Sequence, residues 1–319
     1  MEIEIGEKFS CLTFTGFSLA DEFPDEIRLD ERVWARRAIP LAMEPYWKDW
    51  LGSIRINQLK QSNLALCTTA PSQNPQVLDN ENQDLTQSLY YITFGLLLQG
   101  VPDYDDGYTL TGANVEGEVQ VRQHGELNEY LPSYGMPPFE VGVAEINRAF
   151  SLANKLHRIY QLVADWSRLR RGLRALFKGS EEREWGDRLH QFVRALEALI
   201  KPVVGASRNQ FAHRAQTFAS ATSETRNTLL QIYDIRSKVE HMHSPLDVLD
   251  GTHEERNTLG VRRTRQVDVL SRSALTRVLE SQDLLTIWKS DASIDDFWQM
   301  PDHERVQVWG DRLDLANIW

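Results

Sequence analysis

The chain has 319 residues, of which 41% are hydrophobic and 25% charged, a composition typical of a soluble globular protein and unlike that of a disordered one. Its length is about twice that of a usual domain, so we expect two domains. The net charge of -11 argues against broad, nonspecific binding of polyanions.

The sequence also argues against a membrane protein and against a small domain held together by disulfides or zinc. The first residues, MEIEIGEKF, are acidic where a secretory signal would be basic, and the longest apolar run, YYITFGLLL, is far shorter than the roughly 20 residues of a membrane span. Cys11 and Cys67 lack CxxC spacing, which disfavours a disulfide framework or a zinc knuckle and predicts two buried thiols. We expect a cytoplasmic protein without membrane association.

The first part of the chain mixes strand and helix signals. Three alternating stretches predict strands, at 10–17, 62–70 and 118–127. The segment 80–100 predicts a helix that begins near Asn80 or Asn82 and ends at Gly100. The sequence YLPSYGMPPFE, at 130–140, contains three prolines and interrupts regular structure. We therefore predict a small α+β domain over 1–138.

The second part, 139–319, is predicted to be helical almost throughout. Long amphipathic segments with short connections predict an antiparallel bundle, with helices at 141–178, 181–201, 207–220, 222–243 and 265–290. The predicted fold class is thus mainly α, with a C-terminal helical bundle preceded by a smaller α+β domain. Four tryptophans in the tail could bury in the core or help to form a dimer interface: Trp288, Trp298, Trp309 and Trp319.

Charge is distributed unevenly between the two parts. Nine basic and 21 acidic residues precede residue 139, a net of -12, whereas 26 basic and 25 acidic residues follow, a net of +1. Basic residues cluster in RLRRGLRALFKG (168–179) and RNTLGVRRTR (256–265). These clusters fit either a nucleic-acid surface or two solvated helix faces.

Common catalytic and cofactor signatures do not occur in the sequence. We find no GxxxxGK[ST], GxGxxG, HExxH or GxSxG motif. The acidic run DYDDG (103–107) fits a solvated turn better than a cation site. His241 and His243 would point apart on a helix, and no third ligand suggests itself. We expect neither a metal nor a cofactor.

Two Arg-x4-His strings remain, RNQFAH (208–213) and RSKVEH (236–241). Random composition predicts about 0.9 such string with Lys or Arg in front, so spacing alone decides nothing. In an ideal helix Arg236 and His241 point about 140° apart. They need a distorted helix end, which Pro245 would favour, or a partner subunit in order to converge.

Two interpretations of the second string stay open. Ile232, Ile235, Val239 and Met242 form a predicted buried stripe, with Ser237 and His241 on the opposite face. The pairs Arg236–Glu240 and Asp234–Lys238 have the i,i+4 spacing of an ordinary exposed helix face. Alternatively, a histidine at a helix C-terminus suits acid and base chemistry near neutral pH, and an arginine offers a planar fork to a phosphate.

The segment LLQIYDIRSKVEHMH (229–243) resembles the signature of HEPN domains, in particular the Apea-like branch, in which a Tyr-Asp-x-Arg-Ser-x3-His string closes a long helix. RLHQFVRALEALI (188–200) and FAHRAQTF (211–218) resemble the upstream helices of that branch, with Glu197 at its acidic and Arg214 at its basic position. The resemblance covers roughly residues 145–290.

The resemblance implies an all-α bundle that dimerises so that two such strings face one cleft, and metal-independent cleavage of RNA, often by toxins or antiphage effectors. It implies that Arg236 stabilises charge on the scissile phosphate and that His241 transfers a proton. Ser237 would hydrogen-bond the phosphate, and Glu197 would orient Arg236. The branch has Gly directly after the histidine, whereas Met242 stands there in this chain, which would let the helix continue past the site. Arg208 and His213 are the reserve pair.

We therefore expect an endoribonuclease acting on RNA, a homodimer through the helical domain, with an antitoxin or regulatory protein as a possible partner. The alternative is a non-catalytic HEPN module that binds a protein, a nucleotide or a nucleic acid. The first domain would serve as sensor, regulator or partner-binding module. A metabolic enzyme with its pocket in that domain is the third reading.

Overall fold

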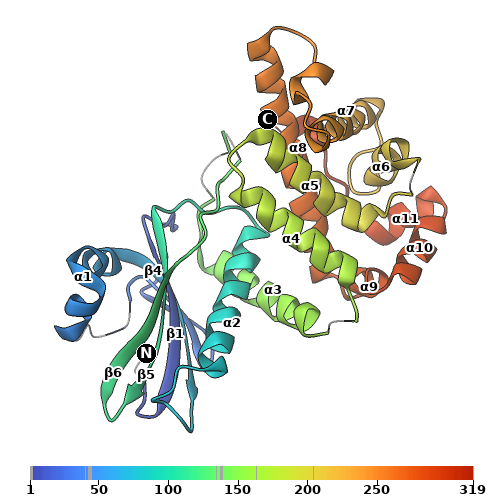
Figure 1. Cartoon of the computed structure of the whole chain (residues 1–319). Coiled ribbons are helices and arrows are strands. Elements are labelled where there is room, and N and C mark those ends of the chain that lie inside the picture. Colours follow the sequence, from blue (N-terminus) through green and yellow to red (C-terminus); the bar gives the residue numbers. More distant parts are fainter. Residues whose placement is uncertain are drawn as a thin grey trace. The chain divides into compact units, whose positions relative to one another are not determined.

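The computed structural model describes residues 3–39, 41, 45–133, 135–136, 139–162, 164–203 and 205–318 (Figure 1). These described residues form eleven α-helices and one six-stranded antiparallel sheet, so the protein is mainly α with an α+β part. Every helix in these ranges is too short or too polar to span a bilayer.

The chain divides into two compact units that are not contiguous in sequence. One contains Met1–Glu129 and Pro137–His157, and the other contains Tyr130–Met136 and Arg158–Trp319. The division therefore does not fall at a single point after residue 138. The two units are called the sheet unit and the helical unit below.

The sheet unit is built on the strand order β2-β3-β4-β1-β5-β6. The strands are β1 (Glu7–Thr15), β2 (Glu26–Asp30), β3 (Val33–Arg36), β4 (Ser62–Pro71), β5 (Asp106–Val115) and β6 (Glu118–Glu126). The three predicted strands correspond to β1, β4 and β6, whereas β2, β3 and β5 were not predicted. Every residue of β1 is buried, because this strand has neighbours on both edges and cover on both faces.

Two helices cover opposite faces of this sheet, as Figure 1 shows: α1 (Pro45–Lys60) and α2 (Asn80–Leu97). Phe9 and Cys11 of β1 share a buried cluster with Trp47 of α1. On the other face, the hydroxyl oxygens of Ser10 and Thr86, in α2, are 2.8 Å apart. Alternate side chains of β1 thus pack on opposite faces of the sheet, one set against α1 and the other against α2.

The predicted start of α2 is confirmed, and it is tied to β1 by charge. Asp79 caps the helix in a capping box with Asn82. The fully buried Lys8 places its Nζ 2.7 Å from Asp79 and 2.9 Å from Glu81. These contacts raise the pKa of Lys8 against the opposing effect of burial, which alone would lower it.

The two cysteines are buried free thiols, as predicted. Cys11 and Cys67 lie directly opposite one another in the antiparallel pairing of β1 with β4. Burial raises the pKa of the Cys11 thiol well above its usual value, and the neighbouring Cys67 adds to this rise.

The helical unit follows α3 (Val143–Gln161), whose last turn belongs to it. Its elements are α4 (Ser167–Glu181), α5 (Trp185–Ile200), α6 (Ser207–Ala215), α7 (Ser223–Glu240), the 3-10 turn η1 (Pro245–Val248), α8 (His253–Glu280), α9 (Gln282–Ile287), α10 (Asp291–Gln299), α11 (Asp302–Trp309) and the 3-10 turn η2 (Leu315–Asn317).

Several helix predictions in this part were wrong in their bounds. The predicted helices 181–201 and 207–220 are observed as Trp185–Ile200 and Ser207–Ala215. The predicted helix 141–178 is broken between α3 and α4, where Trp166 adopts a left-handed conformation with φ 53°. The predicted helix 265–290 begins earlier, at His253, because Thr252 and Glu255 form a capping box there. It also stops at Glu280, and α9 is a separate helix.

Residues 131–133 are bonded into the helical unit. The buried Arg188 of α5 donates to the carbonyl oxygens of Leu131 at 2.6 Å and Pro132 at 3.1 Å. The Ser133 hydroxyl donates to Asp268 of α8 at 2.6 Å, and Asp268 also accepts from Arg272 at 2.7 Å. The first part of the segment that the sequence marked as a domain boundary, Tyr130–Met136, therefore belongs to the helical unit.

The last turn of α5 is the point at which the other helices meet. Its carbonyl oxygens accept hydrogen bonds from four side chains of other elements. Arg168 of α4 donates to Glu197 and Ala198, and Arg214 of α6 donates to Ile200 and Lys201. The indole N–H groups of Trp288 and Trp298 both donate to Leu199, at 3.2 and 3.1 Å. Two cations thus lie at the negative end of the helix dipole.

The tail tryptophans are therefore core residues. Trp288, Trp298 and Trp309 are buried, so they offer no surface to a dimer partner. Trp319 lies outside the described residues.

We expect the Arg214→Met variant to unfold with a free energy about 2–3 kcal/mol lower than the wild type, because two carbonyl oxygens lose a charged donor. The matched control is Arg208→Met on the same helix, which removes an exposed pair with Asp234 and should cost less than about 1 kcal/mol. Urea unfolding followed by circular dichroism measures both. Equal losses would contradict the assigned role of Arg214.

Candidate functional site

The candidate site lies along α7 and the facing side of α5. Helix α7 begins at the cap residue Thr222, whose hydroxyl accepts from the Thr225 N–H. Its buried side includes Leu229, Ile232 and Ile235, at the three-residue and four-residue intervals of an amphipathic helix. The predicted stripe is confirmed for Ile232 and Ile235. It is wrong for Met242, which is 94% exposed.

Helix α7 ends at Glu240, and His241 is its C-cap. Met242 follows in the left-handed conformation, with φ 58°. The Met242 N–H donates to the Val239 carbonyl at 3.0 Å and the His243 N–H donates to the Lys238 carbonyl at 2.9 Å. These two bonds make a Schellman motif, in which glycine is the usual left-handed residue.

The expectation that the helix continues past His241 was therefore wrong. Met242 occupies the left-handed position that a glycine would fill, and the helix stops there despite the side chain. Since a left-handed conformation costs a non-glycine residue about 1–2 kcal/mol, the stop is held by the bonds and by the packing of the preceding turns.

Met242→Gly should raise the free energy of unfolding by about 1 kcal/mol, because glycine adopts the left-handed conformation without steric cost. The matched control is His243→Gly at the next residue, where φ is not positive. This variant should lower the free energy of unfolding by a few tenths of a kcal/mol or more. Thermal and urea unfolding measure both. If the two variants shift in the same direction, strain at Met242 is not the cause.

Arg236 is held by two carboxylates. Its Nη2 lies 3.3 Å from Oε2 of Glu197 on α5, and its Nη1 pairs with Glu240 one turn along α7. The guanidinium also lies over the ring of Tyr233, 5.6 Å from its centroid. Arg236 and Glu197 keep only 15% and 17% of their side chains exposed. The structure thus brings these two predicted site residues together.

His241 and Ser237 are placed differently. The His241 side chain is exposed at the helix end, and within the described ranges no hydrogen bond joins it to Arg236. Ser237 is half-buried, and its carbonyl oxygen accepts the His241 N–H at 3.2 Å. The guanidinium of Arg236 faces α5 and the imidazole faces solvent, so a single chain does not direct both groups at one point.

The predicted pair of Asp234 with Lys238 is not formed in the described part of the chain. Asp234 instead accepts two hydrogen bonds from Arg208 of α6, both at 2.6 Å. His213 lies on the same helix and contacts Asp302 of α11, with Nε2 3.1 Å from Oδ2. The reserve pair Arg208 and His213 is thus engaged by two different helices and does not form a common site.

Two further residues of α5 belong to the site, and the sequence interpretation missed them. His190 and Arg194 precede Glu197 at i, i+4 and i+7 spacing, which places all three on one face of α5. Burial lowers the pKa of His190, and the nearby charges of Arg236 and Arg194 lower it further. The i, i+4, i+7 spacing of three polar residues was the signal that identifies this face.

Glu197 responds to the same surroundings in the opposite sense. Burial raises the pKa of its carboxyl, and the charge of Arg236 opposes that rise. A carboxyl whose pKa is raised by folding makes the protein less stable as the pH rises through the window from the unfolded value, about 4.3, up to the folded value. Deprotonation of Glu197 therefore costs the folded protein some stability across that window.

Replacing Arg236 by Gln should raise the pKa of His190 toward its usual value of about 6.5, because a neighbouring positive charge that disfavours the protonated ring is removed. NMR titration of the His190 ring measures this value. The matched control, Arg208→Gln, removes an arginine that is not among the charges acting on His190 and should leave its titration unchanged. No shift in the first variant would place Arg236 away from His190.

The sequence offers two stretches of possible metal ligands, the acidic run 103–107 and the pair of His241 and His243. Among the described residues, no group of three or more His, Cys, Asp or Glu side chains gathers in a geometry that could hold an ion. In the acidic run 103–107, Asp106 accepts a hydrogen bond from Gln58 at 3.2 Å.

The basic clusters are divided between core and surface. Arg170 is buried and donates to three carbonyl oxygens that end α3 and follow it, those of Ile159, Leu162 and Asp165. Arg171 and Arg174, in the same cluster, are exposed. The cluster 168–179 therefore combines a buried structural arginine with exposed ones, so it matches neither of the two sequence interpretations completely.

Comparisons with known proteins were made on the whole chain. No family model, no curated protein and no solved structure matches it. The assignment of a function thus depends on the geometry of the α5 and α7 residues and on the sequence resemblance.

Proposed function

We propose that the helical unit is a metal-independent endoribonuclease of the Apea-like HEPN kind, with Arg236 and His241 as its catalytic residues. The observation that carries the proposal is the contact of Arg236 with Glu197 beside an exposed His241 at the end of α7. The resemblance assigned these residues those relations, and the Schellman stop at Met242 ends the helix where the glycine of that branch would end it.

A second copy of the chain completes the proposed site. Within one chain the Arg236 guanidinium faces α5 while the His241 imidazole faces solvent. Two copies that meet at the ends of their α7 helices would bring the histidine of one toward the arginine of the other.

The chemistry follows from these groups. His241 takes the proton of the ribose 2'-hydroxyl, the 2'-oxygen forms a bond to phosphorus, and the bond from phosphorus to the 5'-oxygen breaks. The products are a 2',3'-cyclic phosphate and a 5'-hydroxyl, whose oxygen takes its proton from the His241 imidazolium and so restores the neutral ring. Arg236 neutralises charge on the phosphoryl oxygens after exchanging Glu240 for the phosphate, and Glu197 keeps the guanidinium in place.

Cleavage of mixed RNA in the presence of EDTA tests the proposal. His241→Ala and Arg236→Ala should each lower the cleavage rate by about 100-fold or more, because each removes a group needed in the transition state. The matched controls are His213→Ala and Arg208→Ala, the same substitutions in the other Arg-x4-His string, which should retain the wild-type rate. Circular dichroism confirms that all four variants fold.

The controls also decide which histidine acts. His190→Ala should lower the rate less than His241→Ala, because His190 is half-buried on α5. Equal cleavage by the wild type, His241→Ala and Arg236→Ala would overturn the proposal.

The second candidate is a non-catalytic HEPN module that binds a partner. It is favoured by one observation, the pairing of Arg236 with two carboxylates, which leaves the trio with a net negative charge and weakens its attraction for phosphate. Such a module would retain its binding after both alanine substitutions. A toxin or defence role, a regulatory partner protein and a cytoplasmic location belong to the nuclease proposal, with the sheet unit as its sensor.

A further inference from the structure

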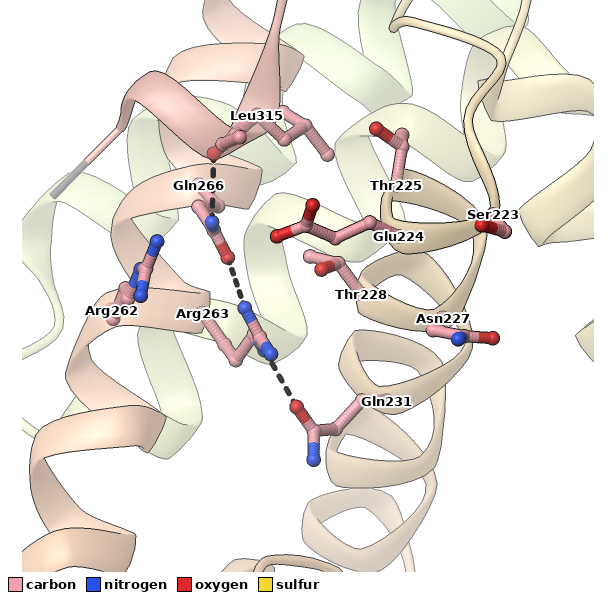
Figure 2. Close-up of a pocket in the computed structure, with 11 residues that line it drawn as sticks. Ser223, Glu224, Thr225, Asn227, Thr228, Gln231, Arg262, Arg263, Gln266 and Leu315 are labelled. Carbon is pink, nitrogen blue, oxygen red and sulfur yellow. Dashed lines mark hydrogen bonds between the residues drawn. The ribbon is translucent and has the colours of Figure 1, made fainter.

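A polar pocket opens at the other end of α7, between α7, α8 and η2 (Figure 2). Its volume is about 420 Å³, within the roughly 300–1,000 Å³ of small-molecule sites. The first turns of α7 form one wall, and Arg262, Arg263 and Gln266 of α8 form the opposite one. The pocket residue of α7 nearest to Arg236 in sequence is Gln231, five positions earlier, and side chains five residues apart point about 140° away from one another around a helix. The pocket is therefore separate from the candidate nuclease site.

Arg263 lies across this pocket in a chain of hydrogen bonds (Figure 2). Its Nε donates to the Gln231 side-chain oxygen at 2.6 Å and its Nη1 donates to the Gln266 side-chain oxygen at 2.8 Å. Gln266 in turn donates to the Leu315 carbonyl at 2.8 Å. The guanidinium is thereby fixed in orientation, while its Nη2 has no hydrogen-bond partner in the described part of the chain.

Arg263 differs from Arg168 and Arg214 because its hydrogen-bond acceptors are the side-chain amides of two glutamines that line the pocket, where theirs are main-chain carbonyl oxygens. Burial and the adjacent charge of Arg262 together lower its pKa to about 10, against the opposing charge of Glu224. A partly buried guanidinium without a carboxylate partner gains most from a bound anion. An arginine fixed in this way is preorganised to accept one.

An acidic group faces Arg263 across the pocket. The side chain of Glu224, in the first turn of α7, projects from α7 toward Gln266 and Arg263 in Figure 2. With two arginines and one glutamate the lining carries a net positive charge. A ligand that fits this arrangement carries an anionic group at one end and hydroxyl donors for a carboxylate at the other.

We propose that this pocket binds a sugar phosphate, that is, a small polyhydroxylated molecule with one phosphate group. The phosphate lies against Nη2 of Arg263 and the side chain of Arg262. The sugar hydroxyls donate to Glu224 and exchange hydrogen bonds with Asn227 and Gln231. This ligand site is independent of the proposed nuclease activity.

The composition of the pocket separates this ligand class from nucleotides and RNA. No aromatic side chain is found among the described residues that line it, so it offers no platform on which a base could stack. Hydroxyl, amide and charged groups predominate, as a sugar requires. The positive charge of the lining comes only from Arg262 and Arg263 of α8, and it does not extend along a groove that an RNA backbone could follow.

Isothermal titration of the full chain tests the proposal with six probes: ribose 5-phosphate, glucose 6-phosphate, inorganic phosphate, ribose, adenosine 5'-monophosphate, and an RNA hexamer without end phosphates. We expect both sugar phosphates to bind more tightly than inorganic phosphate by at least tenfold, and ribose and the hexamer not to bind. Arg263→Met should weaken the sugar phosphates at least tenfold. The control Arg226→Ala changes an exposed arginine of α7 outside the pocket and should have no effect.

Two further variants keep the test informative if Arg263→Met unfolds. Arg262→Met should weaken all phosphorylated probes. Glu224→Ala should weaken the sugar phosphates but strengthen inorganic phosphate, because a negative charge leaves the pocket while the acceptor for hydroxyls is lost.

Three outcomes would overturn the proposal. One is that no phosphorylated probe binds at millimolar concentration. Another is that adenosine 5'-monophosphate binds while ribose 5-phosphate does not, which would assign recognition to a base. The third is that the RNA hexamer alone binds and loses affinity in Arg263→Met, which would make the pocket an RNA-backbone contact.

Discussion

The helical unit depends on how the carbonyl groups at the end of α5 are satisfied. A helix leaves its last carbonyl oxygens without partners, and in a packed core each would cost free energy comparable to a lost hydrogen bond. Here Arg168, Arg214, Trp288 and Trp298 supply the donors from four different elements. One turn of one helix thereby sets the position of α4, α6, α9 and α10.

The last turn of α5 also fixes the position of one residue of the candidate site. Glu197 lies in it, with its backbone carbonyl bonded to Arg168 and its side chain near Arg236. The carboxylate is thus fixed by the same contacts that assemble the bundle. His241, in contrast, is placed by backbone bonds alone, because the Schellman motif sets its distance from the last turn of α7. One half of the site is rigid through packing, and the other half is exposed and available to a second molecule.

Long elements with regular patterns were predictable from the sequence. Helices α2 and α7 carry capping residues and apolar periodicity, and β1, β4 and β6 carry clear alternation. The short strands β2 and β3 have too few residues for a pattern, and α1 contains Gly52 in a non-helical conformation. The break at Trp166 has no Gly or Pro to announce it, because tertiary contacts hold a tryptophan in the left-handed region there.

The site was predictable only in part, for a related reason. The sequence indicated Arg236, His241, Ser237 and Glu197, and the structure brings Arg236 and Glu197 together. Sequence patterns do not show which way an arginine turns. Arg214 and Arg168 resemble surface cations, yet they bind main-chain oxygens inside the bundle. Arg263 resembles a member of a basic run, yet it is fixed by two glutamines at a pocket.

The interleaving of the two units has a practical consequence for anyone who wishes to study them apart. A fragment that starts at residue 139 would lack Leu131, Pro132 and Ser133, which accept from the buried Arg188 or donate to the buried Asp268. It would also keep most of α3, which belongs with the sheet unit. Both pieces would expose surfaces that the intact polypeptide covers. Since each unit is assembled from two separate stretches of the polypeptide, any single cut leaves at least one unit without part of its own contacts.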